Sequence, residues 1–139
     1  MFVYWRKETV MGVWLRANGR LEVVPPPDEK LMVEFWVFSN NTWPEDYKRM
    51  DEHFHNTWFF DKDNRLACTA GKFAEPSIWL KWMKTHFFEP RGYEIVGDEN
   101  IVGEGDPGVN IFDQKIQDEY FEWLGRIKEL CAKFKIHVV

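Results

Sequence analysis

Hydrophobic and polar positions alternate near the start of the chain in a pattern that predicts a β-hairpin. Residues 13–17 and 20–24 are strand-like, and Asn18-Gly19 between them is typical of a two-residue hairpin turn. In the register that this turn imposes, Trp14 lies opposite Val23. We therefore expect the first two strands to pair with each other.

Further strands are predicted by short apolar runs between turn-forming residues. Residues 58–60 and 65–69 flank the polar turn 61–64 and predict a second hairpin. Residues 31–38 are nearly all apolar, which favours a central strand. Short strands are also expected at residues 93–96, 100–102, 109–112 and, in the tail, 135–139.

Helical periodicity marks two segments clearly and suggests a third. From Pro76, apolar residues recur at helical spacing, and Pro90 and Gly92 are expected to end this helix. The last helix is the clearest element, because apolar residues between positions 116 and 134 form one stripe. A short helix is also predicted at residues 44–54, where Pro44 suits a first turn.

Together these elements predict an α+β fold, a mainly antiparallel sheet of hairpins packed against two or three helices. Strict β–α–β alternation, which a parallel sheet needs, is missing from the pattern. A length of 139 residues with 45% hydrophobic residues favours a single α+β domain, residues 1–139.

The sequence predicts a cytoplasmic protein that does not enter a membrane. Charged residues follow soon after Met1, unlike the apolar core of a signal peptide, and no apolar run approaches the ~20 residues of a membrane span. Cys68 and Cys131 are interpreted as buried, reduced thiols, although spacing leaves a disulfide between them open.

Charge and aromatic content bear on the kind of partner. The net charge of −5 opposes non-specific binding to nucleic acid or anionic lipid, so no direct nucleic-acid contact is expected. Aromatic residues make up 17% of the chain. Most rings are expected in the core, but exposed Trp residues are also typical anchors of protein interfaces.

Residues 103–108, GEGDPG, match the spelling of a dinucleotide-binding loop but not its context. That loop requires a helix directly after the glycines, whereas residues 109–112 are strand-like here. Glu104 and Asp106 would repel phosphate, and Pro107 lacks a backbone N–H donor. The stretch therefore predicts a turn between two strands, and no cofactor is expected.

Two weaker patterns suggest a metal-dependent enzyme. Pro27-Asp28 followed by Asp46 and Lys48 spells a nuclease motif, but Asp46 and Lys48 would diverge if they lie on a helix. His53 and His55 are candidate metal ligands if their segment is extended, although spacing specifies no third ligand. A small nuclease-like metal enzyme remains one alternative. A small-ligand binding domain with a pocket lined by aromatic rings is a second, and a homo-oligomeric structural role is a third.

Residues 58–66 read W-x-x-D-x-D-x-x-L, residues 79–93 read W-L-x-W-M-x-x-x-F-F-x-P-R-G-Y, and a G-E-G turn follows. This block resembles small uncharacterised accessory proteins of bacteriophages and prophages. The resemblance implies the setting of a mobile element, in which such proteins are often inhibitors of host defence systems, anti-CRISPR proteins among them. It carries over no catalytic residues.

The leading hypothesis is a non-enzymatic, acidic protein that binds a protein partner. The expected partner is a nucleic-acid-binding host defence protein, whose basic surface the carboxylates would cover. The candidate partner-binding residues are carboxylates in predicted turns and two Trp residues outside the amphipathic stripes: Asp61, Asp63, Glu99, Glu104, Asp106, Trp43 and Trp58.

Overall fold

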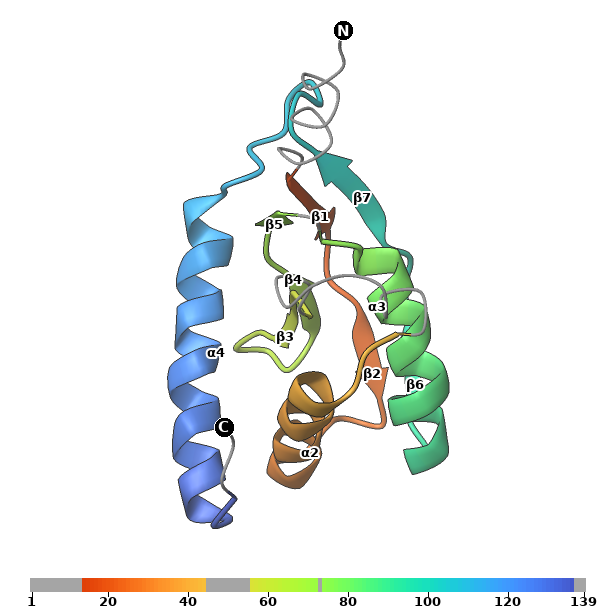
Figure 1. Cartoon of the computed structure of the whole chain (residues 1–139), viewed down its shortest axis with the longest axis vertical. Coiled ribbons are helices and arrows are strands. Elements are labelled where there is room, and N and C mark those ends of the chain that lie inside the picture. Colours follow the sequence, from red (N-terminus) through yellow and green to blue (C-terminus); the bar gives the residue numbers. More distant parts are fainter. Residues whose placement is uncertain (1–13, 45–55, 73, 137–139) are drawn as a thin grey trace, which may run out of the picture.

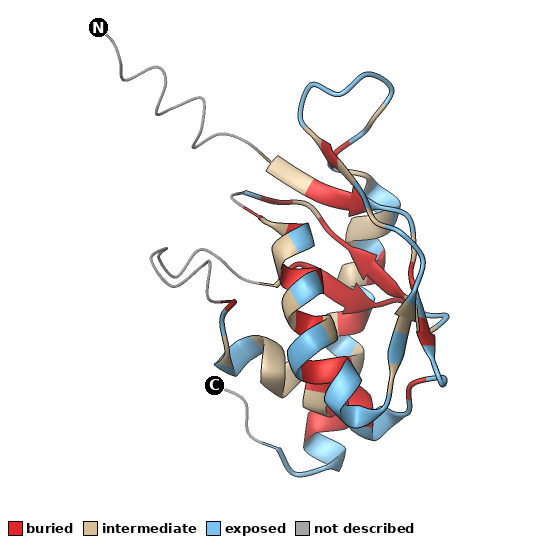
Figure 2. Ribbon diagram, turned by 90° about the vertical axis from the view of Figure 1, so that its right-hand side faces the viewer, coloured by how far each residue is buried: buried red, intermediate tan, exposed pale blue. Residues whose placement is uncertain are grey.

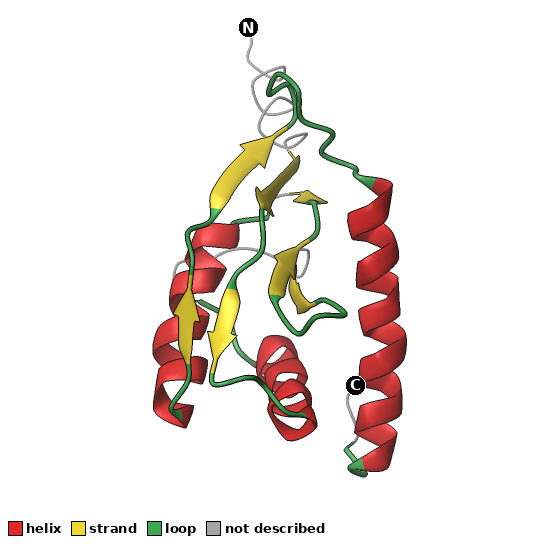
Figure 3. Cartoon of the chain, turned by 180° about the vertical axis from the view of Figure 1, so that it is seen from behind, coloured by secondary structure: helices red, strands yellow, loops and turns green. Residues whose placement is uncertain are grey.

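The computed structural model describes residues 14–44, 56–72 and 74–136, which form an α+β domain. Small antiparallel sheets lie between helix α4 (Gln114–Lys133) on one side and helix α3 (Pro76–Met83) on the other (Figure 1). Helix α2 (Glu29–Asn41) packs against α4 at the end of the molecule away from the β5-β1-β7 sheet. The predicted fold class is thus confirmed (Figure 3).

The predicted pairing of the first two strands is wrong. Strand β1 (Trp14–Asn18) pairs with β7 (Asn100–Gly103) and with β5 (Gly71–Lys72), whereas β2 (Glu22–Val24) pairs with β6 (Glu94–Val96). A two-residue hairpin turn at Asn18-Gly19 would need a positive φ at Asn18, alone in type II′ or together with Gly19 in type I′, and only Gly19 has one, at +109°. The chain therefore continues forward at this point instead of reversing.

The two strand pairs β1–β7 and β2–β6 share one register. Continuing the pairing from Asn18 and Asn100 by four residues leads directly to the pair Glu22 and Val96. The ladder opens in between, where Leu21 exchanges both backbone hydrogen bonds with Leu66 of the neighbouring hairpin, each at 2.9 Å. Gly97, at a φ of +120°, lies against the Leu21 side chain, so the opening depends on glycine.

The second predicted hairpin is confirmed. Strands β3 (Trp58–Phe60) and β4 (Leu66–Cys68) pair antiparallel, with Phe59 opposite Ala67. All their residues are buried, and the turn between them closes with Asn64 in the left-handed region at a φ of 61°.

The strand predicted at residues 31–38 is wrong, because this run lies within α2. Asp28 caps the helix, and its Oδ1 accepts a hydrogen bond from the backbone N–H of Leu31 at 2.8 Å. The helix buries four neighbouring apolar residues, so few polar positions interrupt the run: Leu31, Met32, Val33 and Phe35. A short, fully apolar run does not distinguish such a helix from a buried strand.

The predicted helices at both later positions are confirmed. After α3 the chain continues through a π-helical turn (Lys84–Phe88) and a 3-10 turn (Glu89–Arg91), and Gly92 ends the element at a φ of 84°. The strands predicted at 93–96 and 100–102 are present as β6 and β7. The helix predicted at 44–54 lies, after Pro44, outside the described residues, as do residues 137–139 of the tail.

Residues 109–112 do not form the predicted strand: residues 109 and 110 are irregular, and residues 111 and 112 form a turn. Gly108 has a φ of +74°, and the side chain of Asn110 accepts a hydrogen bond from the backbone N–H of Phe112 at 3.2 Å. These local interactions replace ladder hydrogen bonds and lead the chain into α4.

The core is built around Phe35 of α2. Its ring lies 5.1 Å from Phe60, 5.6 Å from Phe87 and 6.3 Å from Trp123, measured between ring centroids. These contacts join α2 to the hairpin, the π-helical turn and α4, and most of the buried hydrophobic residues belong to one cluster (Figure 2). Cys68 and Cys131 are both buried and free.

Candidate protein-binding surfaces

Asp61, one of the candidate partner-binding residues, lies inside the protein. It is 2% exposed and occupies the start of the β3–β4 turn. One carboxylate oxygen accepts hydrogen bonds from the backbone N–H groups of Asp63 and Arg65, each at 2.9 Å. The other accepts from Arg20 Nη1 at 2.8 Å. The aspartate therefore shapes its own turn.

Arg20 joins three distant parts of the chain. Besides Asp61, it binds Glu119 of α4 with both terminal nitrogens, at 2.7 and 3.0 Å. Its side chain is 20% exposed and those of the two carboxylates are 1% and 10% exposed. This bidentate ion pair fixes the opening between β1 and β2 against the hairpin and α4. We interpret it as a structural element.

Hydrogen bonding and burial shift the pKa values of two arginines that lie next to Asp61, Arg20 and Arg126. Hydrogen bonding by Glu119, with a smaller contribution from Asp61, raises the pKa of the Arg20 guanidinium against the effect of burial. Burial lowers the pKa of Arg126, which donates to the carbonyl oxygens of Phe60 and Asp61 at 3.2 and 3.3 Å. Both guanidinium groups stay charged at neutral pH.

The two candidate Trp residues differ in exposure. Trp58 is 3% exposed, and its indole N–H donates to the carbonyl oxygen of Pro76 at 2.9 Å, so this candidate anchor is buried. Its position in a short, fully buried hairpin strand explains the difference. Trp43 is 50% exposed, just beyond the C-terminus of α2.

Glu104 and Asp106 lie at one end of the molecule, in the turn that follows β7. Asp106 Oδ2 accepts a hydrogen bond from the backbone N–H of Gly103 at 2.8 Å, and Glu104 Oε1 accepts from the backbone N–H of Trp14 at 3.1 Å. Both side chains are exposed. The turn thus holds two carboxylates in fixed positions at the end of the β1–β7 pair.

An aromatic pair lies beside these carboxylates. Trp14 and Phe112 meet edge to face, with ring centroids 5.1 Å apart, and Phe112 is 44% exposed. Arg16, which is 4% exposed, fastens the loop by donating to the carbonyl oxygen of Asn110 at 3.1 Å. We call Trp14, Glu104, Asp106 and Phe112 the acidic tip. Phe112 was missed because its segment was predicted to be a strand.

The other candidate carboxylates lie away from the tip. Asp63 is exposed in the β3–β4 turn and pairs with Arg65 at 3.3 Å. Glu99 is half-buried in the segment between β6 and β7. The structure therefore brings together Glu104 and Asp106 but not the full candidate set.

The GEGDPG stretch forms a turn, as predicted, although no strand follows it. Gly105 and Gly108 have φ values of +88° and +74°. The next helix, α4, begins only at Gln114 and is capped by Asp113. The glycines therefore do not meet the N-terminus of a helix, which the phosphate site of a dinucleotide loop requires.

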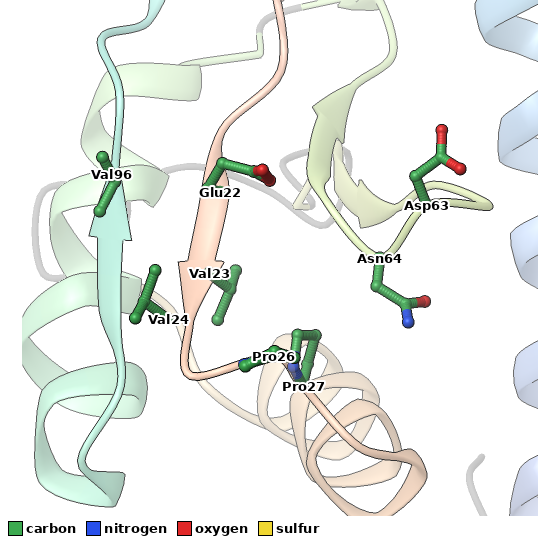
Figure 4. A pocket seen from close by; sticks show the side chains of 8 residues that line it. All are labelled: Glu22, Val23, Val24, Pro26, Pro27, Asp63, Asn64 and Val96. Atoms are coloured by element: carbon green, nitrogen blue, oxygen red, sulfur yellow. The ribbon is translucent and has the colours of Figure 1, made fainter.

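A groove lies between β2 and the β3–β4 turn, with a volume of about 430 Å³ (Figure 4). Its lining combines apolar side chains with two carboxylates and one amide: Val23, Val24, Pro26, Pro27, Val96, Glu22, Asp63 and Asn64. Glu22 points from β2 toward the hairpin turn (Figure 4).

Two other hollows bear on the small-ligand alternative. A cavity of about 70 Å³ lies between α2, α4 and Trp58 and is lined mainly by aromatic rings. This volume suits a few water molecules rather than an organic ligand. A wider hollow of about 500 Å³ lies on the outer side of α3, where Trp82 and His86 stack at 3.8 Å between centroids.

The metal-site candidates lie largely outside the described residues, since His53, His55, Asp46 and Lys48 belong to the segment 45–55. Within residues 14–44, 56–72 and 74–136, no three His, Cys, Asp or Glu side chains are grouped as a metal ion would require. Asp28 serves as the N-cap of α2.

Comparisons with models of protein families, with curated proteins and with solved structures find no match to this chain. Among the helices that the structure describes, none is long and apolar enough to cross a bilayer.

Proposed function

We propose that this chain is a non-enzymatic accessory protein of a mobile element that binds a basic surface on a protein inside the bacterial host cell. The partner we favour is a nucleic-acid-binding enzyme of a defence system, which the chain would inhibit in the manner of an anti-CRISPR protein. The observation that carries the proposal is the acidic tip, where carboxylates held by backbone hydrogen bonds adjoin an exposed aromatic ring.

The chemistry of the tip supports this role. Carboxylates already held in position lose little side-chain entropy on binding, and they attract a basic surface from a distance. Phe112 supplies exposed apolar contact area beside Trp14, as interface anchors do. Trp43, Asp63 and Glu99 stay candidates for additional contacts.

Capture from a lysate of a bacterium that carries the gene tests the proposal. Bound proteins are identified by mass spectrometry at low and at high salt, and the captured partner is purified for measurements of affinity and nuclease activity. The test variant is Glu104→Gln/Asp106→Asn, which removes two charges but keeps the acceptor oxygens. The control, Glu89→Gln/Glu129→Gln, removes two exposed charges elsewhere.

We expect a stoichiometric partner whose affinity falls with salt, and a loss of about tenfold in affinity for the tip variant relative to the control. The same partner should lose nuclease activity when the chain is bound. Equal affinity of both variants would remove the tip from the mechanism, and an active nuclease in the complex would refute inhibition.

A further inference from the structure

The solvent-facing side of the β2–β6 pair carries a mixed pattern of charge and apolar surface. Glu22 lies opposite Val96, and Val24 lies opposite Glu94, so the carboxylates and the valines each occupy one diagonal. All four side chains are exposed, and each valine is 47% exposed. Two β-branched apolar side chains are thus left in water between two carboxylates.

The groove described above adds a wall to this face. Pro26 and Pro27 border it where the chain turns into α2, and Asp63 and Asn64 border it on the side of the hairpin (Figure 4). The apolar walls and the carboxylate of Glu22 therefore line the same groove, whose volume is about 430 Å³.

The charges at this surface are predominantly negative and mostly uncompensated. Within the described part of the chain, Glu22 and Glu94 form no ion pair, and Asp63 shares its charge with the half-exposed Arg65 at 3.3 Å. A cation entering the groove would meet at least two carboxylates, whereas an anion would be repelled. The groove also offers apolar contact along its length, which a small hydrated cation would not use.

We propose that this groove binds an arginine side chain of a partner protein. The aliphatic stem packs against Val24, Val96 and Pro26, and the guanidinium binds Glu22 and Asp63. Arginine fits this combination because it joins an apolar stem to a planar, weakly hydrated cation that pairs with carboxylates. The proposal rests on the proposed function as a protein-binding chain and names a second, separate contact with the partner.

A titration with short peptides, followed by nuclear magnetic resonance of the ¹⁵N-labelled full chain, tests the groove directly. The probes are acetyl-Gly-Gly-Arg-Gly-Gly-amide and the same peptide with citrulline, which is nearly isosteric with arginine but neutral. A lysine peptide measures how much the planar guanidinium adds. We expect saturable shifts from the arginine peptide at residues 22–24, 63–64 and 94–96, and at least about fivefold weaker binding of citrulline.

The matched variants are Glu22→Gln/Asp63→Asn in the groove and Glu89→Gln/Glu129→Gln elsewhere. The first should weaken arginine binding by about fivefold, and the second should leave it unchanged. Equal binding of citrulline, or no saturable shift in the groove, would overturn the proposal. Shifts confined to residues 104–112 would also overturn it while leaving the acidic tip as the binding surface, so the two proposals fail separately.

Discussion

Asp61 and Asp63 stand two residues apart in the same turn, yet the structure predicts a large loss of stability when Asp61 loses its charge and almost none when Asp63 does. The Asp61→Asn substitution keeps an acceptor oxygen for the backbone N–H groups of Asp63 and Arg65 but turns an amide N–H₂ toward Arg20. Donor then faces donor at a site where the aspartate side chain is 1% exposed. Asp63→Asn changes only an exposed contact with Arg65.

The expected magnitudes follow from burial. Breaking a buried ion pair by removing one partner costs about 3–5 kcal/mol, and Arg20 keeps Glu119, so Asp61→Asn should lose about 3 kcal/mol. Asp63→Asn should change the free energy of unfolding by less than about 0.5 kcal/mol, as exposed pairs do. For a domain of this size, the first loss corresponds to a decrease in Tm of about 10 °C.

Urea denaturation at pH 7, followed by tryptophan fluorescence and circular dichroism, measures both variants under identical conditions. A double-mutant cycle with Arg20→Met should give a coupling energy of about 1–3 kcal/mol between Arg20 and Asp61. Similar, small losses for the two aspartate variants would refute the structural role assigned to Asp61.

Three further predictions concern stability. Burial raises the pKa of Cys68 to about 11, above the ordinary 9.0, so the folded state holds this proton more tightly and stability should fall by about 2 kcal/mol as the pH rises from 9 to 11. Unfolding of Cys68→Ala across this range should show a correspondingly flatter profile. Gly97→Ala should lower the free energy of unfolding by about 1–3 kcal/mol in urea denaturation, because the new Cβ would lie 3.0 Å from Leu21 at a residue with a positive φ. Gly125→Ala in α4 is the control: its Cβ would meet nothing within 4 Å, and the substitution should stabilise the protein by about 0.5–1 kcal/mol. Asp28→Ala should lower stability by about 1 kcal/mol through loss of the α2 cap, and Asp28→Asn should restore most of it.

The elements that could be predicted from the sequence are those whose local pattern and tertiary surroundings agree. Helix α4 has one apolar stripe and buries it, as Trp123 and Ile127 illustrate. The β3–β4 hairpin has a polar turn between apolar runs, and its strands pair as that pattern predicts. In both cases the interactions that decide the structure lie close together in the sequence.

The predictions were wrong where residues far away in the sequence determine the local structure. Asn18-Gly19 has the composition of a hairpin turn, but Leu21 gains both backbone hydrogen bonds from Leu66, far along the chain. Asp61 lies in a predicted surface turn, yet Arg20 and Glu119 reach it from two other elements and enclose it. For α2, the local signal was available, since Asp28 followed by Glu29 is typical of a helix start.

Of the acidic tip, only the two carboxylates could be predicted from the sequence. Glu104 and Asp106 were found because glycines and proline mark an exposed turn around them. Phe112 was not, because its exposure depends on how Asn110 turns the chain before α4. The groove beside β2 depends on the pairing of β2 with β6 and could not be predicted with the wrong strand partner.

The open section of the β1–β7 and β2–β6 ladder places a strict demand on chain length. Three residues on each side, Gly19 to Leu21 and Gly97 to Glu99, separate the two paired regions. Because side chains alternate between faces, deleting one residue from Gly19 to Leu21 would present the buried Val23 to water and turn Glu22 toward the core. Matched deletions on both sides would restore the pairing but lose the Leu21–Leu66 bridge. A scan of single insertions and deletions across these six positions should therefore lower stability far more than the same changes in the turn at 104–108. No strand pairing there depends on the number of residues.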